Sequence, residues 1–484
     1  MFKNAFSWKR HICLPLILLV SVVLWLMPSA WFGLDDLTTV QQRMIAIFVF
    51  AALSWIFEII PNWVTSLTVI VVMLLTLSDK GLSFLCTPSA GVLVDYKAIM
   101  SSFADPVIML FLGGFVLAIV ASKYGMDAVI AKGLLGIFGQ KPVWVLLGFL
   151  LTISLFSMFM SNTATAAMML AFLAPVLKAL PDNETGKVGL ALSIPFAANI
   201  GGIGTPIGTP PNAIALGALS NAGYDISFAS WMARMVPYVI VMIVIIWGLL
   251  MLFFPFKSKQ IVLTIRTEKR KMDAKAWVAW ITFFVTILLW VTESVTGINS
   301  NIVALIPVAV YACTGVFCKE DLKEINWSVL WLVAGGFALG TGLENTGLAV
   351  TLIHAIPFST MNVVWVLVIA GLVCYLFSNF ISNTATAALL IPIMIVIGRA
   401  MSSPESANYG QFLSIGGIYA LISFVALNAS LAMLFPVSTP PNAIAASTGL
   451  VKTSDMAKVG ILVGIVGWVL GYLLLTKIFP FSLS

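Results

Sequence analysis

Three pairs of short peptides recur along this chain in the same order. They are Gly-Gly-Phe at 113–115 and 335–337, Ser-Asn-Thr-Ala-Thr-Ala-Ala at 161–167 and 382–388, and Thr-Pro-Pro-Asn-Ala-Ile-Ala at 209–215 and 439–445. Matches that keep their order and nearly keep their spacing indicate an internal duplication. We therefore expect two homologous halves, 41–256 and 275–484, preceded by an N-terminal segment at 1–40 and joined by a connector at 257–274.

Long apolar stretches dominate both halves. Of the 484 residues 61% are hydrophobic and 9% are charged, whereas soluble proteins carry about 25% charged residues. This composition argues against a soluble enzyme, a secreted module or a disordered scaffold, and it predicts an all-α polytopic membrane protein. We expect about eleven transmembrane helices, near 12–32, 42–60, 62–78, 104–125, 188–220, 232–256, 275–296, 300–318, 327–346, 412–449 and 457–479.

The first apolar run, 12–32, follows a short basic segment and could be read as a signal peptide. Its apolar core is longer than the roughly 7–15 residues of such peptides, so we expect a retained first helix.

Polar or proline-containing interruptions mark four apolar stretches. In 142–180 and 361–400 the Ser-Asn-Thr motif lies at the centre, and we expect re-entrant hairpins, because non-helical backbone at that depth is tolerated only where it is buried in protein or lines a cavity. In 188–220 and 412–449 two consecutive prolines interrupt the sequence. Proline lacks an N–H and clashes with the preceding turn, so both stretches should be broken helices.

Basic residues set the expected orientation. The connector 257–274 carries six Lys and Arg residues against one Asp and one Glu, and such loops lie in the cytoplasm, as the N-terminus should. Five crossings in each half turn the second copy upside down and place the C-terminus outside. Inverted-topology repeats with interrupted helices are typical of secondary transporters, whose substrate and ions bind between the repeats near the midplane.

The hairpin motifs offer ligands for both a cation and an anion. Ser157 precedes the first motif by one helical turn, and Ser378 precedes the second. Neutral oxygens suit a hard cation such as sodium, while amide and hydroxyl groups can donate to a carboxylate. Close packing of small residues is the alternative explanation. A buried amide is costly unless it is bonded, so the repeated Asn162 and Asn383 favour a binding site.

The Thr-Pro-Pro-Asn breaks should present helix N-termini, whose free N–H groups and dipole favour an anion. The glycine-rich run 201–208 resembles a phosphate loop, but no strand precedes it and no lysine follows, which argues against nucleotide binding. Neither motif has a Lys or Arg close in sequence. Helix dipoles and bound cations would therefore have to balance a dianion, which predicts coupling to cations.

Four charged residues, Glu58, Asp105, Lys123 and Glu293, lie in or near expected spans. A charge at such a place can be a proton or ion site. None is duplicated in the other half, so structural or interfacial roles are favoured. The two histidines and five cysteines form neither a His-Glu-x-x-His nor a CxxC pattern, which argues against an enzyme or a zinc site.

The paired Ser-Asn-Thr and Thr-Pro-Pro-Asn motifs, in this order and spacing, resemble those of the divalent anion/sodium symporter family, which includes bacterial and animal sodium–dicarboxylate and citrate transporters. The resemblance covers essentially the whole chain. It implies an eleven-span homodimer in the cell membrane, with a scaffold part and a transport part that carries substrate across by an elevator-like movement.

The resemblance also implies site residues, position by position. The sodium sites would be formed by Ser157, Ser161, Asn162 and Gly208 in the first half, and by Ser378, Ile381 (through its carbonyl), Asn383 and Ser438 in the second. The substrate carboxylates would contact Asn162, Thr163, Thr209, Pro210, Asn383, Thr384, Thr439 and Pro440.

These expectations describe a secondary active transporter that couples sodium to the uptake of a dicarboxylate such as succinate, malate or fumarate. Sodium-independent exchange of dicarboxylates, and transport of citrate, 2-oxoglutarate or sulfate by the same fold, remain open. A channel and an intramembrane enzyme are more remote alternatives. Sodium is the expected coupling ion, with no organic cofactor and no nucleic-acid partner.

Overall fold

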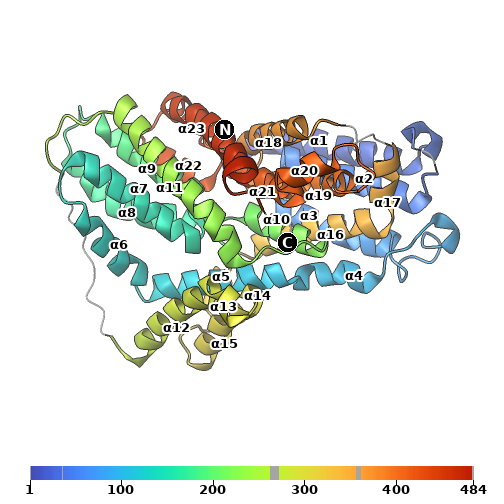
Figure 1. Cartoon of the computed structure of the whole chain (residues 1–484), viewed down its shortest axis with the longest axis horizontal. Helices are drawn as coiled ribbons and strands as arrows, with labels where there is room; N and C mark the ends of the chain where they lie inside the picture. Colours follow the sequence, from blue (N-terminus) through green and yellow to red (C-terminus); the bar gives the residue numbers. More distant parts are fainter. Residues whose placement is uncertain (1, 35, 262–271, 356–360, 482–484) are drawn as a thin grey trace.

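The computed structural model describes residues 2–34, 36–261, 272–355 and 361–481. Its regular secondary structure there is helical, apart from one isolated bridge between Ser78 and Val94 (Figure 1). Within this described part ten helices are long and apolar enough to cross a membrane, and four shorter apolar helices accompany them. The chain is an all-helical polytopic membrane protein, as its composition predicts.

The first half runs from α2 to α11, after an N-terminal helix α1. The bounds are α1 Phe2–Leu26, α2 Thr39–Phe57, α3 Asn62–Thr76, α4 Tyr96–Met100, α5 Pro106–Lys123, α6 Met126–Ile137, α7 Pro142–Phe159, α8 Asn162–Ala179, α9 Gly186–Gly202, α10 Pro210–Asn221 and α11 Phe228–Phe253.

The second half repeats much of this order, with α5 to α11 corresponding to α16 to α23, where α20 and α21 together take the place of α9. The bounds are α12 Ala274–Val291, α13 Glu293–Thr296, α14 Ser300–Val303, α15 Leu305–Cys313, α16 Trp327–Asn345, α17 Leu348–Ala355, α18 Val363–Phe380, α19 Asn383–Met401, α20 Tyr409–Ser414, α21 Gly417–Ala429, α22 Pro440–Ser447 and α23 Thr453–Leu473. The expected crossing at 300–318 is two short helices, α14 and α15, and the stretch 412–449 is divided among α20, α21 and α22. Most of the connector 257–274 lies outside the described residues.

Each Ser-Asn-Thr motif forms the tip of a helical hairpin, α7–α8 in the first half and α18–α19 in the second. The serine is the N-cap of the second arm, because its hydroxyl accepts a hydrogen bond from the third N–H of that arm. Ser161 accepts from Ala164 at 3.2 Å, and Ser382 accepts from Ala385 at 3.2 Å. The same residues that end one helix therefore begin the next.

Each Thr-Pro-Pro-Asn motif begins a new helix after a break, α10 after α9 and α22 after α21. The asparagine of the motif turns back and donates to carbonyls that the break leaves without helical partners. Asn212 donates to the Thr205 carbonyl at 2.8 Å, and Asn442 donates to the Phe435 carbonyl at 2.8 Å. The breaks are thus ordered structures with their own hydrogen bonds.

The two halves pack against one another in an exchanged pattern. α22 of the second half packs on α8 and α9 of the first, while α10 of the first half packs on α19 and α21 of the second. Likewise α3 packs on α16, and α5 packs on α14 and α15. Figure 1 shows α7, α8, α9 and α11 gathered at one end and α16, α17, α19 and α20 toward the other, with α12, α13 and α15 below α5 at the lower edge. Each half therefore completes the packing of the other.

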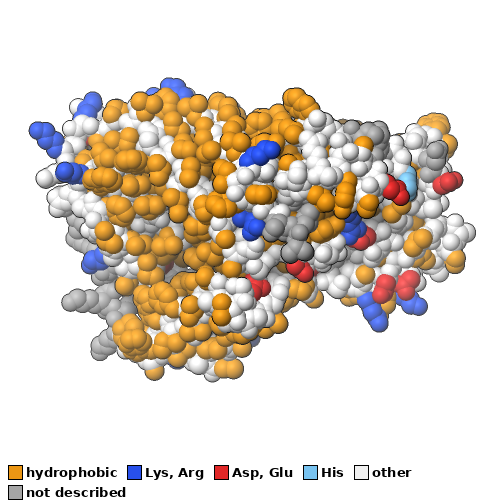
Figure 2. Space-filling view, in the orientation of Figure 1, with side chains coloured by type: hydrophobic (Ala, Val, Ile, Leu, Met, Phe, Trp, Pro, Cys, Tyr) orange, Lys and Arg blue, Asp and Glu red, His pale blue; other side chains and the backbone are white. Residues whose placement is uncertain are grey.

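The surface is apolar over a wide area. Figure 2 shows hydrophobic side chains across much of one face, with Lys and Arg at its left end, in the middle and at the lower right, and Asp and Glu from the middle to the right. Large side chains such as Trp277 and Leu288 of α12 and Trp365 of α18 are 56%, 60% and 63% exposed. Contiguous exposed apolar surface of this kind suits contact with lipid.

Candidate functional site

The two hairpin tips and the two helix breaks meet around one cavity of about 210 Å³. From the first half it is lined by Ser161, Asn162, Thr163, Asn199, Ile207, Gly208, Thr209 and Pro210. From the second half it is lined by Ser382, Asn383, Thr384, Ser438, Thr439, Pro440 and Pro441, and it is closed by Phe111 and Phe115 of α5 and by Asn326 and Val329 at the start of α16. All eight residues expected to contact substrate lie on this wall.

Besides α16, whose N-cap Asn326 lines the cavity, four helices begin there. Their N-cap residues are Ser161 of α8, Thr209 of α10, Ser382 of α19 and Thr439 of α22. A helix N-terminus carries a partial positive charge. Among the described residues no Asp, Glu, Lys, Arg or His lines this cavity. The convergent helix ends are thus its main fixed electrostatic feature, and they favour an anion.

The hairpins and the breaks contribute different donors. In α8 the first backbone hydrogen bond of the helix is donated by Thr165. The N–H groups of Asn162 and Thr163 precede it and have no carbonyl of the helix to donate to, and the same holds at α19. In α10 and α22 the first two residues are prolines, which have no N–H. The expectation that the Thr-Pro-Pro-Asn breaks offer free N–H groups therefore fails at their first two helical positions, and the breaks contribute a dipole and a threonine hydroxyl instead.

An oxygen-rich site lies behind the tip of the first hairpin. The Ser157 hydroxyl lies 2.6 Å from the Ala198 carbonyl and 2.7 Å from the side-chain oxygen of Asn162, yet it has one hydrogen for these two acceptors. The same end of the Asn162 amide lies 3.1 Å from the Gly208 carbonyl. These oxygens are satisfied if the amide turns its nitrogen toward them, or if a cation lies among them.

Gly208 keeps this site open. A Cβ atom at this position would lie 2.4 Å from the Gly202 carbonyl oxygen and 2.9 Å from the Ser157 carbonyl oxygen. Neutral hydroxyl, amide and carbonyl oxygens are the ligands that a hard cation prefers. The residues present therefore fit the sodium ion expected at Ser157, Ser161, Asn162 and Gly208.

The second hairpin repeats part of this arrangement. The Ser378 hydroxyl lies 2.9 Å from the Asn383 side-chain oxygen and also bonds the Ala429 carbonyl, again one hydrogen for two acceptors. Ser438 donates its hydroxyl hydrogen to the Asn379 carbonyl at 2.7 Å and accepts from the Phe435 N–H at 3.3 Å, which leaves one lone pair of the hydroxyl and its own carbonyl for a cation. Ile381 ends α18 as a buried residue and does not line the cavity.

The four charged residues singled out in the sequence lie at helix ends, away from this cavity. Glu58 ends α2 in the left-handed conformation, and Asp105 caps α5 through the N–H of Val107 at 2.8 Å. Glu293 accepts from the N–H of Phe228 at 2.9 Å. These contacts fit the structural roles favoured from the sequence.

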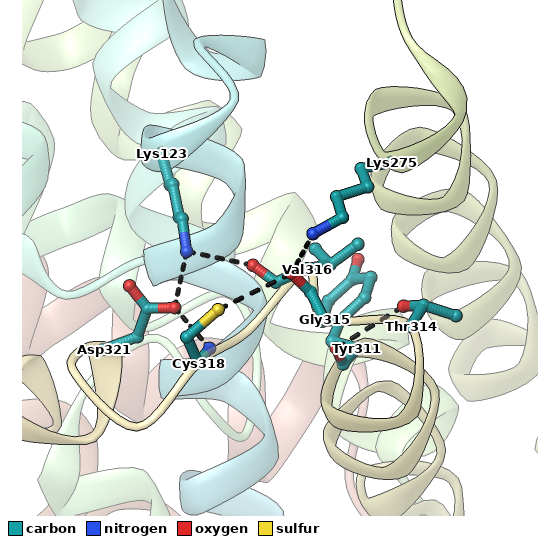
Figure 3. A network of polar contacts seen from close by, with 8 residues as sticks. All are labelled: Lys123, Lys275, Tyr311, Thr314, Gly315, Val316, Cys318 and Asp321. Atoms are coloured by element: carbon teal, nitrogen blue, oxygen red, sulfur yellow. Dashed lines mark hydrogen bonds and ion pairs between the residues drawn. The ribbon is translucent and has the colours of Figure 1, made fainter.

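Lys123, the fourth of these residues, holds the loop between α15 and α16 (Figure 3). Its ammonium donates to Asp321 at 2.6 Å and to the Val316 carbonyl at 3.0 Å, and Asp321 also accepts from the Cys318 N–H at 2.6 Å. Burial disfavours the Asp321 carboxylate, but these donors outweigh it, so the pKa of Asp321 lies below its ordinary value. The network ties the end of α5 to a loop almost 200 residues later.

A larger cavity of about 300 Å³ lies between the start of α5 and helices α10, α16 and α19. Contacts between these elements surround it. Arg399 of α19 pairs with Glu344 of α16 at 2.8 Å, and Asn221 of α10 donates to Asp105 at 3.0 Å. Sequence reasoning missed these pairs, because Glu344 and Arg399 belong to no repeated motif.

Comparison with known proteins identifies the chain's relatives. The citrate transporter family model, CitMHS, matches residues 52–416. An uncharacterized transporter of Haemophilus influenzae is 35% identical over 77% of this chain and 81% of its own length. The sodium-dependent dicarboxylate transporter SdcS of Staphylococcus aureus is 28% identical over 96% of this chain and 91% of its own.

Another relative is much longer than this chain. An uncharacterized transporter of Schizosaccharomyces pombe is 32% identical over 90% of this chain, which spans half of that protein. Among solved structures, the YdaH transporter of Alcanivorax borkumensis matches 87% of this chain and 98% of its own, with a TM-score of 0.54 and 12% identity, which speaks for the fold alone. The chain belongs to the citrate transporter family, and its resemblance to the divalent anion/sodium symporters is confirmed.

Proposed function

We propose that this protein is a sodium-coupled symporter of C4 dicarboxylates such as succinate, malate or fumarate. The observation that carries the proposal is the cavity where four helices begin and which no charged side chain of the described residues lines. Each half contributes one hairpin tip and the threonine that precedes its two prolines. Each carboxylate of a dianion would therefore have its own set of donors. The similarity to a sodium-dependent dicarboxylate transporter gives independent support.

The two carboxylates would bind at opposite ends of the cavity. The residues proposed for one end are Asn162, Thr163, Thr209 and Pro210, and those for the other are Asn383, Thr384, Thr439 and Pro440. Backbone N–H groups and side-chain amides and hydroxyls would donate to the carboxylate oxygens.

Sodium would supply the positive charge that the cavity lacks, held by Ser157, Ser161, Asn162 and Gly208 and by Ser378, Ile381, Asn383 and Ser438. The amide of Asn162 gives a reason for coupling. When its oxygen faces the Gly208 carbonyl and a cation, its nitrogen is left to donate to the substrate; when its nitrogen faces that carbonyl, its oxygen repels a carboxylate. Cation and anion would therefore favour the same orientation of one side chain.

We further propose that the halves are inverted repeats and that substrate crosses by an elevator-like movement. The transport part would comprise the two hairpins, the two broken helices, α11 and α23, and it would move against a scaffold that includes α2, α3, α5 and α16. Contacts such as Glu344–Arg399, Asp105–Asn221 and Asn62–Ser382, at 2.8, 3.0 and 3.3 Å, would break during this movement. Each hairpin arm has 18 or 19 residues, which is long enough to span a membrane. We propose that the hairpins are nevertheless re-entrant, because their tips meet the helix breaks at the cavity.

The remaining expectations complete the proposal. The halves would be 41–256 and 275–484, the N-terminus cytoplasmic, the C-terminus outside, and the assembly a homodimer in the cell membrane. The exchanged packing of α10 and α22 supports the duplication.

Uptake of radiolabelled succinate into proteoliposomes tests the proposal. We expect uptake to collapse when an imposed sodium gradient is replaced by potassium or choline. Asn162→Ala and Asn383→Ala should each abolish uptake in protein that remains folded. Uptake that ignores sodium but requires preloaded dicarboxylate would identify an exchanger, and a panel with citrate, 2-oxoglutarate and sulfate would expose another preferred anion.

A further inference from the structure

Asn199 is a cavity residue that belongs to no repeated motif. It lies near the end of α9, its side chain is fully buried, and it lines the cavity between the hairpin tips. Its amide nitrogen donates to the Thr439 hydroxyl at 3.1 Å and to the Asn442 side-chain oxygen at 3.2 Å. Asn199 therefore joins the broken helix of the first half to the break of the second.

The orientation of these amides is fixed by their neighbours. Asn442 donates from its nitrogen to the carbonyls of Ala432 at 3.3 Å and Phe435 at 2.8 Å. Its side-chain oxygen must therefore face a donor, and that donor is the nitrogen of Asn199. Neither amide can be reversed without placing two acceptors against one another.

This arrangement determines what the Thr439 hydroxyl can do. Its oxygen accepts one hydrogen bond from Asn199 at 3.1 Å and another from the backbone N–H of Asn442 at 3.3 Å. A hydroxyl oxygen has two acceptor positions and one hydrogen. With both acceptor positions used, the hydroxyl can take part in a further hydrogen bond only as a donor, and Thr439 lines the cavity.

The corresponding break in the first half lacks this arrangement. The Thr209 side chain makes no capping hydrogen bond, whereas Thr439 accepts from Asn442. Asn428, on the corresponding helix α21, donates to the Phe424 carbonyl of its own helix at 2.7 Å. Asn428 is as fully buried as Asn199. The two ends of the cavity therefore differ although their motifs are identical.

We propose that Asn199 is a positioning residue that makes the Thr439 hydroxyl an obligate donor to one carboxylate of the substrate. The inference rests on the proposed transport of dicarboxylates and adds an asymmetry to it. The end at Thr439 is preorganised for an ionised carboxylate and disfavours a group that must itself donate. The end at Thr209 has a hydroxyl that can either donate or accept.

The test compares Asn199→Ala with Asn428→Ala, which removes an equally buried asparagine whose amide donates to a carbonyl of its own helix. Succinate KM and maximal uptake rate are measured in proteoliposomes, and succinate-induced thermal stabilisation in detergent. We expect Asn199→Ala to raise KM about 10-fold, equivalent to losing about one hydrogen bond's net contribution. The maximal rate should change less than about 2-fold, and Asn428→Ala should leave KM within that margin.

A double-mutant cycle with Thr439→Val separates positioning from a general packing effect. If Asn199 acts through the Thr439 hydroxyl, Asn199→Ala should add nothing to the KM of Thr439→Val. Additive effects, or an unchanged KM in Asn199→Ala, would overturn the inference. Asn199→Leu, which keeps the approximate size of the side chain but removes the donor without adding charge, should raise KM as well and is measured if the alanine variant does not fold.

Measurements on the wild-type protein distinguish a failure of the proposed function from a failure of the proposed role of Asn199. If wild-type protein binds none of a panel of di- and tricarboxylates, the proposed function fails and the role of Asn199 fails with it. If the wild type binds succinate and Asn199→Ala keeps the wild-type KM, only the role of Asn199 fails.

Discussion

The Ser157 hydroxyl lies 2.7 Å from the side-chain amide of Asn162, across the tip of the first hairpin. Ser157 is fully buried and also reaches the Ala198 carbonyl at 2.6 Å. If the Asn162 amide turns its nitrogen toward Ser157, it donates and the cluster is satisfied; if it turns its oxygen there, one hydroxyl hydrogen faces two acceptors and a cation would satisfy the cluster. This relationship underlies the expected dependence on sodium.

Ser157→Ala should weaken sodium binding while leaving the substrate contacts in place. We expect the sodium concentration for half-maximal uptake to rise about 10-fold, which corresponds to about 1.4 kcal/mol. The matched control is Ser154→Ala, one turn earlier on α7, where the buried hydroxyl donates to the Ala197 carbonyl at 3.2 Å. An equal shift in both variants would contradict the assignment of the ion site.

Gly208→Ala should close the same site by volume. The new Cβ would lie 2.4 Å from the Gly202 carbonyl oxygen, so the backbone of one of the two residues would have to shift. Overpacking of this kind costs about 1–3 kcal/mol, so we expect sodium-dependent uptake to be lost and the thermal midpoint to fall. Gly248→Ala on α11, where a Cβ meets nothing within 4 Å, is the control and should retain uptake. Normal uptake by Gly208→Ala would show that no ion needs this space.

Much of this site could be predicted because its signals are local. Ser161 and Ser382 cap helices that begin at the next residue, and two consecutive prolines follow Thr209 and Thr439 at the helix breaks, whereas a single proline such as Pro195 lies inside a continuous helix. Duplication then indicated that the four interruptions belong together, and the structure brings them to one cavity.

The rest depends on contacts between distant positions. Asn199 looks like any polar residue in an apolar helix until its partner Thr439, 240 positions away, is known. Lys123 gains its role from Asp321, 198 positions away. The Ser438 hydroxyl donates to the Asn379 carbonyl, 59 positions away. One chain without an alignment carries no signal for such pairings.

Glu344→Lys should destabilise the conformation described here, because it places a positive charge against Arg399. Their side chains are 45% and 30% exposed, so the effect should be about 1 kcal/mol or less, and a fall of about 2 °C in the thermal midpoint is expected. The double exchange Glu344→Arg with Arg399→Glu restores opposite charges and should recover the midpoint. Failure of the exchange to recover it would mean that the pair does not join α16 to α19 in solution.

Glu184 should make stability depend on pH at the base of the first hairpin. Its carboxylate accepts from the backbone N–H groups of Lys257 and Ser258, both at 2.8 Å, and from the Ser258 hydroxyl at 2.6 Å. Burial disfavours the charge, but these donors outweigh it and hold the pKa of Glu184 below 4.5. A lowered pKa means that the stabilisation is complete above the unfolded pKa and is lost as the pH falls through the folded one.

Glu184→Gln should therefore lower the thermal midpoint at pH 7, by an amount equivalent to about 1–3 kcal/mol, because it removes a charged acceptor from several donors. The difference from wild type should begin to shrink as the pH falls below the unfolded pKa of a glutamate, about 4.3, and should disappear once the pH is below the lowered pKa of the folded carboxylate. Thermal unfolding of both proteins between pH 7 and pH 3.5 measures this convergence. Because Glu184 lies at the base of the hairpin, succinate KM at pH 7 should stay at the wild-type value. A difference in thermal midpoint that stays constant across the pH range would show that the Glu184 carboxylate is not the group that stabilises this junction.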